Sequence, residues 1–178
     1  MSLSTFEKLL ERNKEYVPKH VLLPSVADMR ATPMPPGFSQ TVIIACSDPR
    51  VSPELFLNIA PGDLQASFIR VAGGRAIDAL RSLIVLDGML KISTVVVIHH
   101  TDCGLTHQTN EAIRDRIKLL APDHASKIDE MGFGHIHDHE SALNEDVAYL
   151  KDSPYLAKDV EVAGYLYDLK TGALNKVA

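Results

Sequence analysis

Short apolar runs separated by turn residues organise the middle of the chain. Three runs rich in β-branched and other apolar residues predict buried strands: 41–45, 66–71 and 92–98. Two segments between them predict helices: 52–59, which opens with Ser52-Pro53, and 77–90, which is apolar on nearly every side and should be largely buried. Strands that alternate with helices in this way predict a mostly parallel sheet covered on both faces.

The flanking regions have other patterns. Apolar residues spaced among charges predict an amphipathic helix over 3–16. The next stretch, 17–40, holds five of the ten prolines, so it cannot form one regular element, although a helical turn near 25–29 is compatible with it. After the third strand the pattern predicts helices over 110–120 and 140–150, an irregular segment over 121–138, and a last strand and hairpin over 160–177.

These elements together predict an α/β fold. We expect a single domain with a central, mostly parallel β-sheet flanked by helices, an N-terminal helical arm and a C-terminal antiparallel hairpin. The arm covers residues 1–40 and needs a surface to cover, so we expect it to contact another subunit. Residues 41–178 form the α/β domain that carries the candidate site.

Composition narrows the class of protein without changing this picture. The chain has 178 residues, of which 46% are hydrophobic and 23% charged, and its net charge is −5. These values fit a globular domain and argue against nucleic acid or an anionic membrane as a partner. No apolar run approaches the roughly 20 residues of a membrane span, and the charged N-terminal residues do not resemble a signal peptide. We therefore expect a cytoplasmic location.

The two cysteines of the chain stand at the ends of predicted strands. Cys46 follows the run 41–45, and Cys103 lies three residues after His100, just beyond the run 92–98. If the two strands are neighbours, their carboxyl ends bring these three side chains together. Thiolate and imidazole are ligands that zinc prefers, and three protein ligands with an open fourth position are typical of catalytic zinc. A cysteine alone is often a small buried hydrophobe, but two cysteines and a histidine at one edge favour a metal.

His99, Asp48 and Arg50 are the next candidates beside this cluster. Side chains alternate along a strand, so His99 should point away from His100, packed behind the strand or bonded to the backbone. Asp48 and Arg50 follow Cys46 closely. A carboxylate near zinc accepts a proton or binds the metal, and an arginine partner keeps it ionised. A loop salt bridge without a chemical role is the alternative, and the position beside Cys46 favours the functional interpretation.

Three motifs together closely resemble the β-class carbonic anhydrases: Cys46-x-Asp48-x-Arg50, Arg70-Val71-Ala72-Gly73-Gly74 and His100-Thr101-Asp102-Cys103-Gly104. Their order and spacing agree with that family over residues 41–104, and the double His99-His100 is similar to a compact branch of it. The resemblance implies a zinc ion, Zn2+, bound by three residues: Cys46, His100 and Cys103. It also implies an orienting catalytic dyad of Asp48 and Arg50, in which Asp48 itself binds zinc in a closed, inactive state.

The activity that this resemblance implies is the reversible hydration of carbon dioxide to bicarbonate by a zinc-bound hydroxide. Relatives of the compact branch hydrolyse carbonyl sulfide or carbon disulfide, which is the alternative substrate class. A small, linear, apolar substrate needs an apolar pocket. Four residues are candidates to line it: Gly73, Gly74, Gly104 and Leu105. The glycine pair would allow close approach of the backbone, Gly104 N–H would bind developing negative charge, and Leu105 would form an apolar wall.

Other functions compete with this one. A non-catalytic zinc protein, in which Asp48 permanently fills the fourth position, is one alternative, and a thiol redox protein is another, although the sequence has no Cys-x-x-Cys. The segment His135-x-His137-x-His139 is more simply a solvated loop than a second metal site. His107 or one of these histidines is a candidate proton relay. The resemblance and the apolar face of 3–16 lead us to expect a homodimer or a higher even homo-oligomer that acts on a small molecule.

Overall fold

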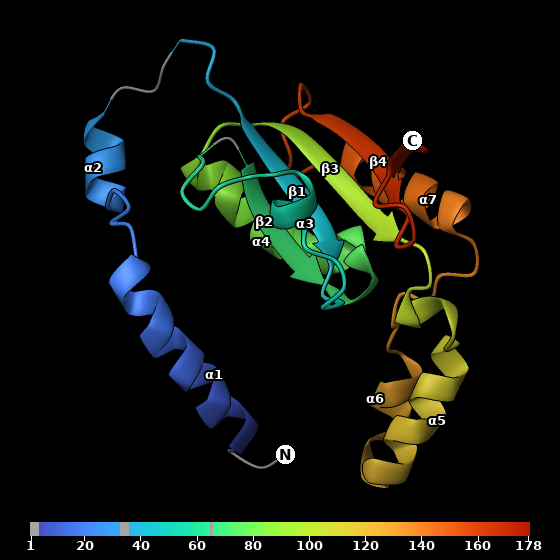
Figure 1. Ribbon diagram of the computed structural model, residues 1–178. Helices are drawn as coiled ribbons and strands as arrows, with labels where there is room; N and C mark the ends of the chain where they lie inside the picture. Colours follow the sequence, from blue (N-terminus) through green and yellow to red (C-terminus); the bar gives the residue numbers. More distant parts are fainter. Residues whose placement is uncertain (1–3, 33–35, 65) are drawn as a thin grey trace. The chain divides into compact units, whose positions relative to one another are not determined.

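The computed structural model describes residues 4–32, 36–64 and 66–178 (Figure 1). The chain divides into two compact units, Met1–Pro36 and Gly37–Ala178. The first unit holds α1 (Ser4–Tyr16), a 3-10 turn (Val17–Lys19) and α2 (Val26–Ala31). Ser25 begins α2 with a capping box, because its hydroxyl accepts from the Asp28 N–H at 3.1 Å and the Asp28 carboxylate accepts from the Ser25 N–H at 3.0 Å. The predicted first helix and helical turn are confirmed from Ser4 onward, and residues 33–35 of the proline-rich stretch lie outside the described residues.

A five-stranded sheet forms the centre of the second unit, in the order β2-β1-β3-β4-β5. Its strands are β1 (Gln40–Cys46), β2 (Ala66–Val71), β3 (Ile92–His100), β4 (Glu161–Tyr167) and β5 (Leu174–Lys176). The first four run parallel to their neighbours, and β5 pairs antiparallel with β4. The predicted α/β fold and C-terminal hairpin are confirmed, but β3 continues past the predicted end at residue 98 and includes both histidines.

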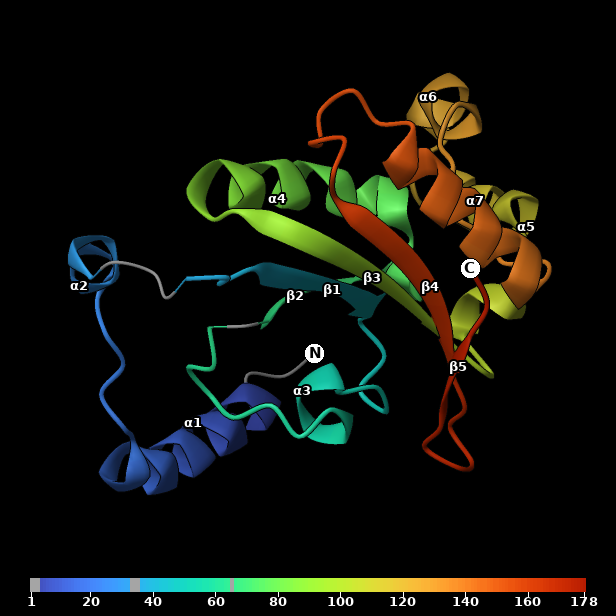
Figure 2. The ribbon, with the colours of Figure 1, turned by 90° about the horizontal axis from the view of Figure 1, so that it is seen from above.

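Helices lie on both faces of this sheet (Figure 2). One face is covered by α4 (Ala76–Met89) and α7 (His139–Lys151), and the other by the short α3 (Pro53–Phe56). The larger apolar cluster joins α4 and α7 to the strands through residues such as Val42, Val95, Leu83 and Leu143. The smaller cluster, on the α3 face, includes Ile43, Ala45, Ile98 and Phe56. Consecutive residues of β1 therefore face opposite clusters, as the two-residue period of a strand requires.

Two helix predictions need correction in the region before β3. α3 ends at Phe56 instead of near residue 59, and the hydroxyl of Ser52 donates to Glu54 at 3.2 Å instead of capping the helix. α4 is not largely buried, since the sheet covers only one side of it. Its buried residues are Ala76, Ala79 and Leu83, whereas Ile77 on its other side is 61% exposed. An apolar surface therefore runs along α4 in the single chain.

The segment after α5 (Asn110–Leu120) also differs from its prediction. It is not irregular over all of 121–138, because it forms a 3-10 turn (Pro122–His124) and α6 (Ala125–Asp129) beside α5. Ile128 of α6 is buried, and a single apolar anchor of this kind leaves too weak a periodic pattern to be found in the sequence. Within the described ranges, no helix combines the length and the apolar character that crossing a membrane requires.

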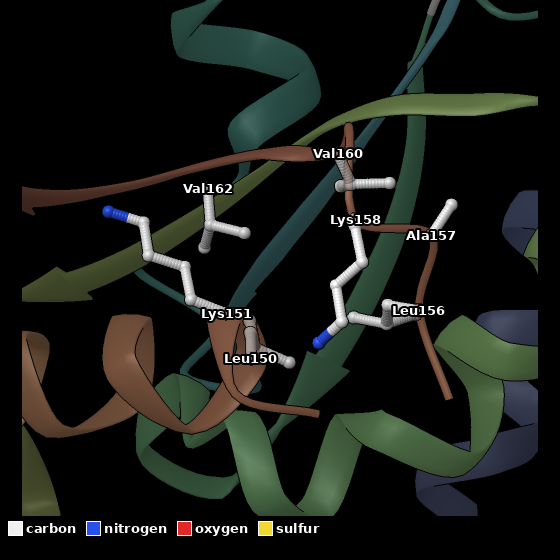
Figure 3. Close-up of a pocket in the computed structure, with 7 residues that line it drawn as sticks. All are labelled: Leu150, Lys151, Leu156, Ala157, Lys158, Val160 and Val162. Atoms are coloured by element: carbon white, nitrogen blue, oxygen red, sulfur yellow. The ribbon is translucent and has the colours of Figure 1, made fainter. Parts of the chain in front are cut away.

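A cavity of about 240 Å³ lies at the amino end of β4 (Figure 3). We call it the amino-end cavity. It is formed by the end of α7 and the segment that leads into β4, and it is lined by Leu150, Lys151, Leu156, Ala157, Lys158, Val160 and Val162. It therefore lies at the opposite end of the sheet from Cys46 and His100, where β1 and β3 finish.

Candidate metal centre

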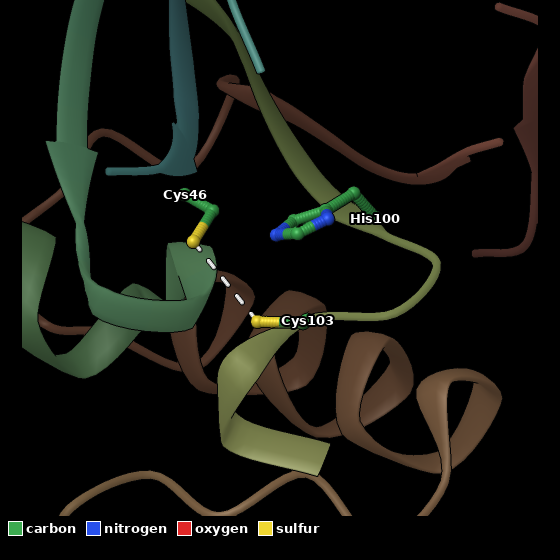
Figure 4. Close-up of side chains that lie close together, drawn as sticks. All are labelled: Cys46, His100 and Cys103. Carbon is green, nitrogen blue, oxygen red and sulfur yellow. Dashed lines mark hydrogen bonds between the residues drawn. The ribbon is translucent and has the colours of Figure 1, made fainter. Parts of the chain in front are cut away.

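The carboxyl ends of β1 and β3 bring the three predicted ligands together (Figure 4). The two strands are parallel neighbours, with Ala45 paired to Ile98, so Cys46 and His100 finish at the same edge. The two Sγ atoms and a ring nitrogen of His100 all lie within 4.8 Å of one another. In the part of the chain that the structure describes, this is the only group of three or more His, Cys, Asp or Glu found to be spaced for a metal ion.

A tight turn after β3 delivers Cys103 to this group. Asp102 adopts the left-handed conformation, with φ of 55°, which costs a non-glycine residue about 1–2 kcal/mol. Beyond the turn, the backbone N–H and the hydroxyl of Thr106 both donate to the Cys103 carbonyl, at 2.9 and 2.7 Å. These bonds form the start of a 3-10 turn (Gly104–Thr106) and fix the backbone from which the Cys103 thiol projects.

The bonding of His100 fits a metal ligand. Its side chain is fully buried, and its Nδ1 lies 2.9 Å from the carbonyl oxygen of Thr101. A carbonyl only accepts, so Nδ1 carries the proton and Nε2 keeps a free lone pair. Nε2 is buried and has no hydrogen-bond partner among the described residues. A metal ion would satisfy this nitrogen, and a backbone carbonyl that fixes the other ring nitrogen is the usual arrangement for a ligating histidine.

The two thiols are free and buried, with their sulfur atoms 4.0 Å apart. The hydrogen bond between them lowers the pKa of Cys46 and raises the pKa of Cys103. The Asp48 N–H, 3.4 Å from the Cys46 sulfur, also stabilises a thiolate there. Since the thiolate is the form of cysteine that binds metal, this environment favours the ligating form at Cys46 and the protonated form at Cys103.

Asp48 and Arg50 form a two-pronged ion pair beside the cluster. Arg50 Nε lies 3.1 Å from Asp48 Oδ1, and Nη2 lies 2.8 Å from Oδ2. These hydrogen bonds lower the pKa of Asp48 to about 2, so the carboxylate is ionised at neutral pH. Its Oδ2 lies 3.9 Å from His100 Nε2. The pair is thus aimed at the same space as the free ring nitrogen.

Further contacts of this loop could not be read from the sequence. Arg50 Nη1 also lies 2.8 Å from Asp102 Oδ2, and Asp102 Oδ1 lies 2.9 Å from Nε2 of His107. Arg70 donates to three carbonyls of the loop after β1: those of Cys46, Asp48 and Val51. The acidic residue beside Cys103 and the arginine at the end of β2 were visible signals. However, Arg50 lies 52 positions from Asp102, and the carbonyls that Arg70 contacts lie 19 to 24 positions away.

The glycine pair fits closely against the cluster. Gly73 and Gly74 have φ of 66° and 70°, which favours glycine. A Cβ on Gly73 would lie 2.6 Å from Leu105 Cδ1, and a Cβ on Gly74 would lie 2.8 Å from the Ile98 carbonyl oxygen. Leu105 packs against the buried Cys46 and Cys103, whereas Gly104 is exposed with no heavy atom near an added Cβ.

Ile136 is a wall residue that the sequence did not reveal. It is fully buried in the cluster that contains both cysteines, and its N–H donates to the Leu105 carbonyl at 3.1 Å. Its neighbours His135 and His137 place their rings 6.3 Å apart, edge to face. Neither these histidines nor His139 belongs to the metal-spaced group.

His99 faces away from His100, on the α4 and α7 side of the sheet. It was expected to pack behind the strand or to bond to backbone, and it is buried there with its Nε2 2.9 Å from Asp146 Oδ2 of α7. The partner is thus a side chain. His139, at the start of α7, places its ring 6.1 Å from that of His99, and burial lowers its pKa.

The sequence and the fold of this chain are similar to those of known carbonic anhydrases. A sequence model of the family described as carbonic anhydrase matches residues 41–174. The structure of a carbonic anhydrase from Glaciozyma antarctica is similar with a TM-score of 0.81 and 34% identity, covering 100% of both chains. Beta-carbonic anhydrase 1 of Mycobacterium tuberculosis is 29% identical over 152 residues, 82% of this chain and 85% of the relative. A carbon disulfide hydrolase of Acidianus is 28% identical over 155 residues, 75% of each chain.

Proposed function

The chain belongs to the β-carbonic anhydrase family, and from that premise we propose that it is a zinc enzyme that catalyses the reversible hydration of carbon dioxide to bicarbonate. One observation carries the proposal: Cys46, His100 and Cys103 converge, and the buried Nε2 of His100 has no partner among the described residues. Membership of the family supports an enzyme. The assignment of the metal, the reaction and the residues is our proposal.

Zinc suits the donor set of this site. Two sulfurs and one imidazole nitrogen are ligands that zinc prefers, and three such ligands leave a fourth position for reaction. A zinc ion held there would supply a Lewis acid that lowers the pKa of a coordinated water to about 7. Cys46 and Cys103 would bind as thiolates, and Thr101 would hold the His100 ring in the ligating tautomer through Nδ1.

Asp48 would act as the orienting acceptor. It is ionised, so it accepts a hydrogen bond from the attacking water and turns a lone pair of that water toward the substrate carbon. Arg50 engages both of its oxygens and restricts the carboxylate to this role. In the closed, inactive state Asp48 would leave Arg50 and take the fourth position on the metal. The two-pronged contact supports the open arrangement.

The candidate pocket suits a small apolar substrate. Gly73 and Gly74 bring the backbone close to the cluster, and Leu105 with Ile136 supplies apolar surface beside the cysteines. The exposed Gly104 would offer its N–H to a substrate oxygen that gains negative charge. These groups would position the substrate and exclude water, and Asp48 would orient the nucleophile that a bound metal would supply.

A second candidate activity is the hydrolysis of carbonyl sulfide or carbon disulfide at the same site. The similarity to a carbon disulfide hydrolase favours it, and so does the buried Ile136 beside Leu105. A tight apolar pocket suits a polarisable sulfur substrate and disfavours charged bicarbonate, because an ion is costly to bury in apolar surroundings.

Side-by-side turnover measurements on the zinc-loaded protein test these activities. Carbon dioxide hydration is followed with a pH indicator in a stopped-flow instrument, and carbonyl sulfide and carbon disulfide hydrolysis by release of sulfide. We expect the highest kcat/KM with carbon dioxide. A higher value with a sulfur substrate would replace the anhydrase by the hydrolase. Stoichiometric zinc without turnover would indicate a non-catalytic zinc protein, and absence of bound zinc would leave the thiol redox alternative.

We further propose a cytoplasmic homodimer or higher even oligomer. Apolar side chains are exposed on two helices: Phe6, Leu9 and Leu10 of α1, and Ile77, Val85 and Met89 of α4. A second copy of the chain is the occupant that would cover them, with the arm of residues 1–40 as a contact. Light scattering of the full chain and of a chain that starts at residue 38 tests this. A monomeric full chain at micromolar concentration would refute it.

A further inference from the structure

A buried polar network lies behind the metal centre, on the α4 and α7 face of the sheet. Its members are Arg75, His99 and Asp146, of which His99 is 0% and Asp146 3% exposed. Their neighbours on α7, Leu143 and Val147, belong to the apolar core. Burial of charged groups is costly, and apolar residues of similar size often stabilise a fold as well or better. The network therefore calls for an explanation other than stability.

The Asp146 carboxylate joins three segments of the chain. Its Oδ2 lies 2.9 Å from His99 Nε2 and 3.0 Å from Arg75 Nε, and its Oδ1 accepts from the Ala76 N–H at 3.2 Å. One carboxylate thus connects α7, the start of α4 and the end of β3. Because Nδ1 of His99 has no hydrogen-bond partner among the described residues, Asp146 is the group that orients this ring.

Each of these attachments lies next to a part of the metal centre. His99 precedes the ligand His100, and Arg75 follows the Gly73-Gly74 turn. That turn is in tight contact with both ligand-bearing strands, since a Cβ on Gly74 would lie 2.8 Å from the Ile98 carbonyl oxygen and 3.1 Å from the Cys46 N. A shift of either attachment would therefore move the backbone that carries the ligands.

Arg75 also supports the loop of residues 134–136, which covers the cysteines. A Cβ on Gly134 would lie 2.8 Å from Arg75 Cγ, so the loop passes directly over the arginine stem. Two residues later Ile136 is fully buried against Cys46 and Cys103. Asp146 holds the guanidinium of Arg75 at Nε, 3.0 Å from Oδ2, and Glu145 accepts from its Nη2 at 3.3 Å. The Asp146 carboxylate thus supports the metal centre from the strand, from the glycine turn and from the covering loop.

We propose that Asp146 is a positioning residue of the metal centre, which holds the His99–His100 strand end and the Gly73–Gly74 turn in the register that tight metal binding requires. This inference rests on the proposed metal site but not on the identity of the substrate. Groups that orient metal ligands from outside the first coordination sphere typically contribute about 10–100-fold to affinity or activity. We expect Asp146→Asn to fall at the lower end of that range, because it acts through His99.

Cobalt(II) binding to the full chain tests the proposal without any assay of activity. Asp146→Asn should weaken cobalt(II) binding by roughly tenfold and shift the visible ligand-field bands. Val147→Ala is the matched control, because this neighbour on α7 is buried in the apolar core and outside the network. It should lower the melting temperature of the metal-free protein but leave the cobalt affinity and bands unchanged. Unchanged affinity and bands in Asp146→Asn, or equal changes in Val147→Ala at equal loss of stability, would overturn the proposal.

Two more variants keep the test decisive if Asp146→Asn fails to fold. Arg75→Met keeps the stem under Gly134 and removes the guanidinium, and Arg75→Lys restores a positive charge. We expect weaker cobalt(II) binding in Arg75→Met and partial recovery in Arg75→Lys, whereas wild-type affinity in Arg75→Met would count against the network. If the wild-type chain binds cobalt(II) but turns over none of the three substrates, the proposed function fails and the positioning role is still decided by these spectra.

Discussion

The two ends of the sheet differ in what they offer a ligand. At the carboxyl end, two thiols, an imidazole and the Asp48–Arg50 pair converge. The buried Nε2 of His100 has no hydrogen-bond partner there among the described residues. At the amino end, the amino-end cavity has a volume of about 240 Å³, but its lining consists of five apolar residues and the side chains of Lys151 and Lys158. The first place brings reactive groups together, and the second offers space without reactive groups.

This contrast shows why volume alone is a poor guide to function in this molecule. A catalytic site needs groups whose bonding capacity is unfulfilled and whose pKa values are shifted toward the reactive form. His100 meets the first condition through its Nε2, which has no hydrogen-bond partner among the described residues, and Cys46 meets the second through its lowered pKa. The two residues lie together because parallel strands end at the same edge. The lining of the amino-end cavity comes from one helix end and the segment that follows it, which adjoin simply because they are close in sequence.

Removal of a ligand should have the largest effect at the carboxyl end. Cys46→Ser replaces a thiolate by a weaker ligand, so we expect loss of most bound zinc and a fall in turnover beyond about 100-fold, the upper end of what outer groups contribute. Elemental analysis and stopped-flow assays measure both. The control is Ser47→Ala, which changes the exposed next residue and should retain full zinc content. Equal zinc in Cys46→Ser and the wild-type protein would refute the ligand assignment.

Arg50→Ala should have the next largest effect, and it separates orientation from metal binding. Without Arg50 the Asp48 carboxylate loses its two-pronged partner and becomes free to turn or to bind the metal. We expect kcat to fall by roughly 100-fold, within the range for a general acid–base group, while zinc content holds. Arg116→Ala, which changes an exposed arginine on α5, is the control. Unchanged turnover in Arg50→Ala would remove the dyad from the mechanism.

The sequence predicted the cluster of Cys46, His100 and Cys103 because each part of it is marked by neighbouring residues in the chain. Cys46 and His100 each end an apolar run, and the Thr41–Ala45 and Ile92–Ile98 runs were recognisable by composition alone. The parallel pairing then follows from the strand–helix alternation. The predicted ligands meet for this reason, even though Cys46 and Cys103 are 57 positions apart.

Contacts that depend on packing between distant segments could not be predicted from the sequence. Arg50 to Asp102 and Asp146 to His99 join residues 52 and 47 positions apart, and no periodic pattern records such a partner. α4 shows the same limit in another way: its sequence is apolar nearly all round, which predicts burial, but the sheet of this chain covers one side only. The sequence indicates that a surface is apolar without indicating what covers it.

A change in the apolar wall should have a smaller effect and bears on the choice of substrate. Leu105→Ala removes apolar surface beside both cysteines and opens space next to Gly73. We expect kcat/KM for carbonyl sulfide to fall relative to carbon dioxide by about tenfold, the low end of what a small change in an apolar pocket contributes. The exposed Leu120 provides the control variant Leu120→Ala. An unchanged ratio would exclude Leu105 as a specificity residue.

The smallest effect is expected at the amino-end cavity, and it tests the comparison directly. Lys151→Met combined with Lys158→Met keeps the side-chain stems and removes both charges. Neither ammonium pairs with a carboxylate among the described residues, so little stability should be lost. Zinc content should be unchanged, and kcat/KM for carbon dioxide should stay within about twofold, because the cavity offers no group that touches the reacting atoms. A loss of fivefold or more with zinc retained would show that this end of the sheet takes part in the activity. Both ends of the sheet would then contribute to the activity, and they would differ only in the part that each plays.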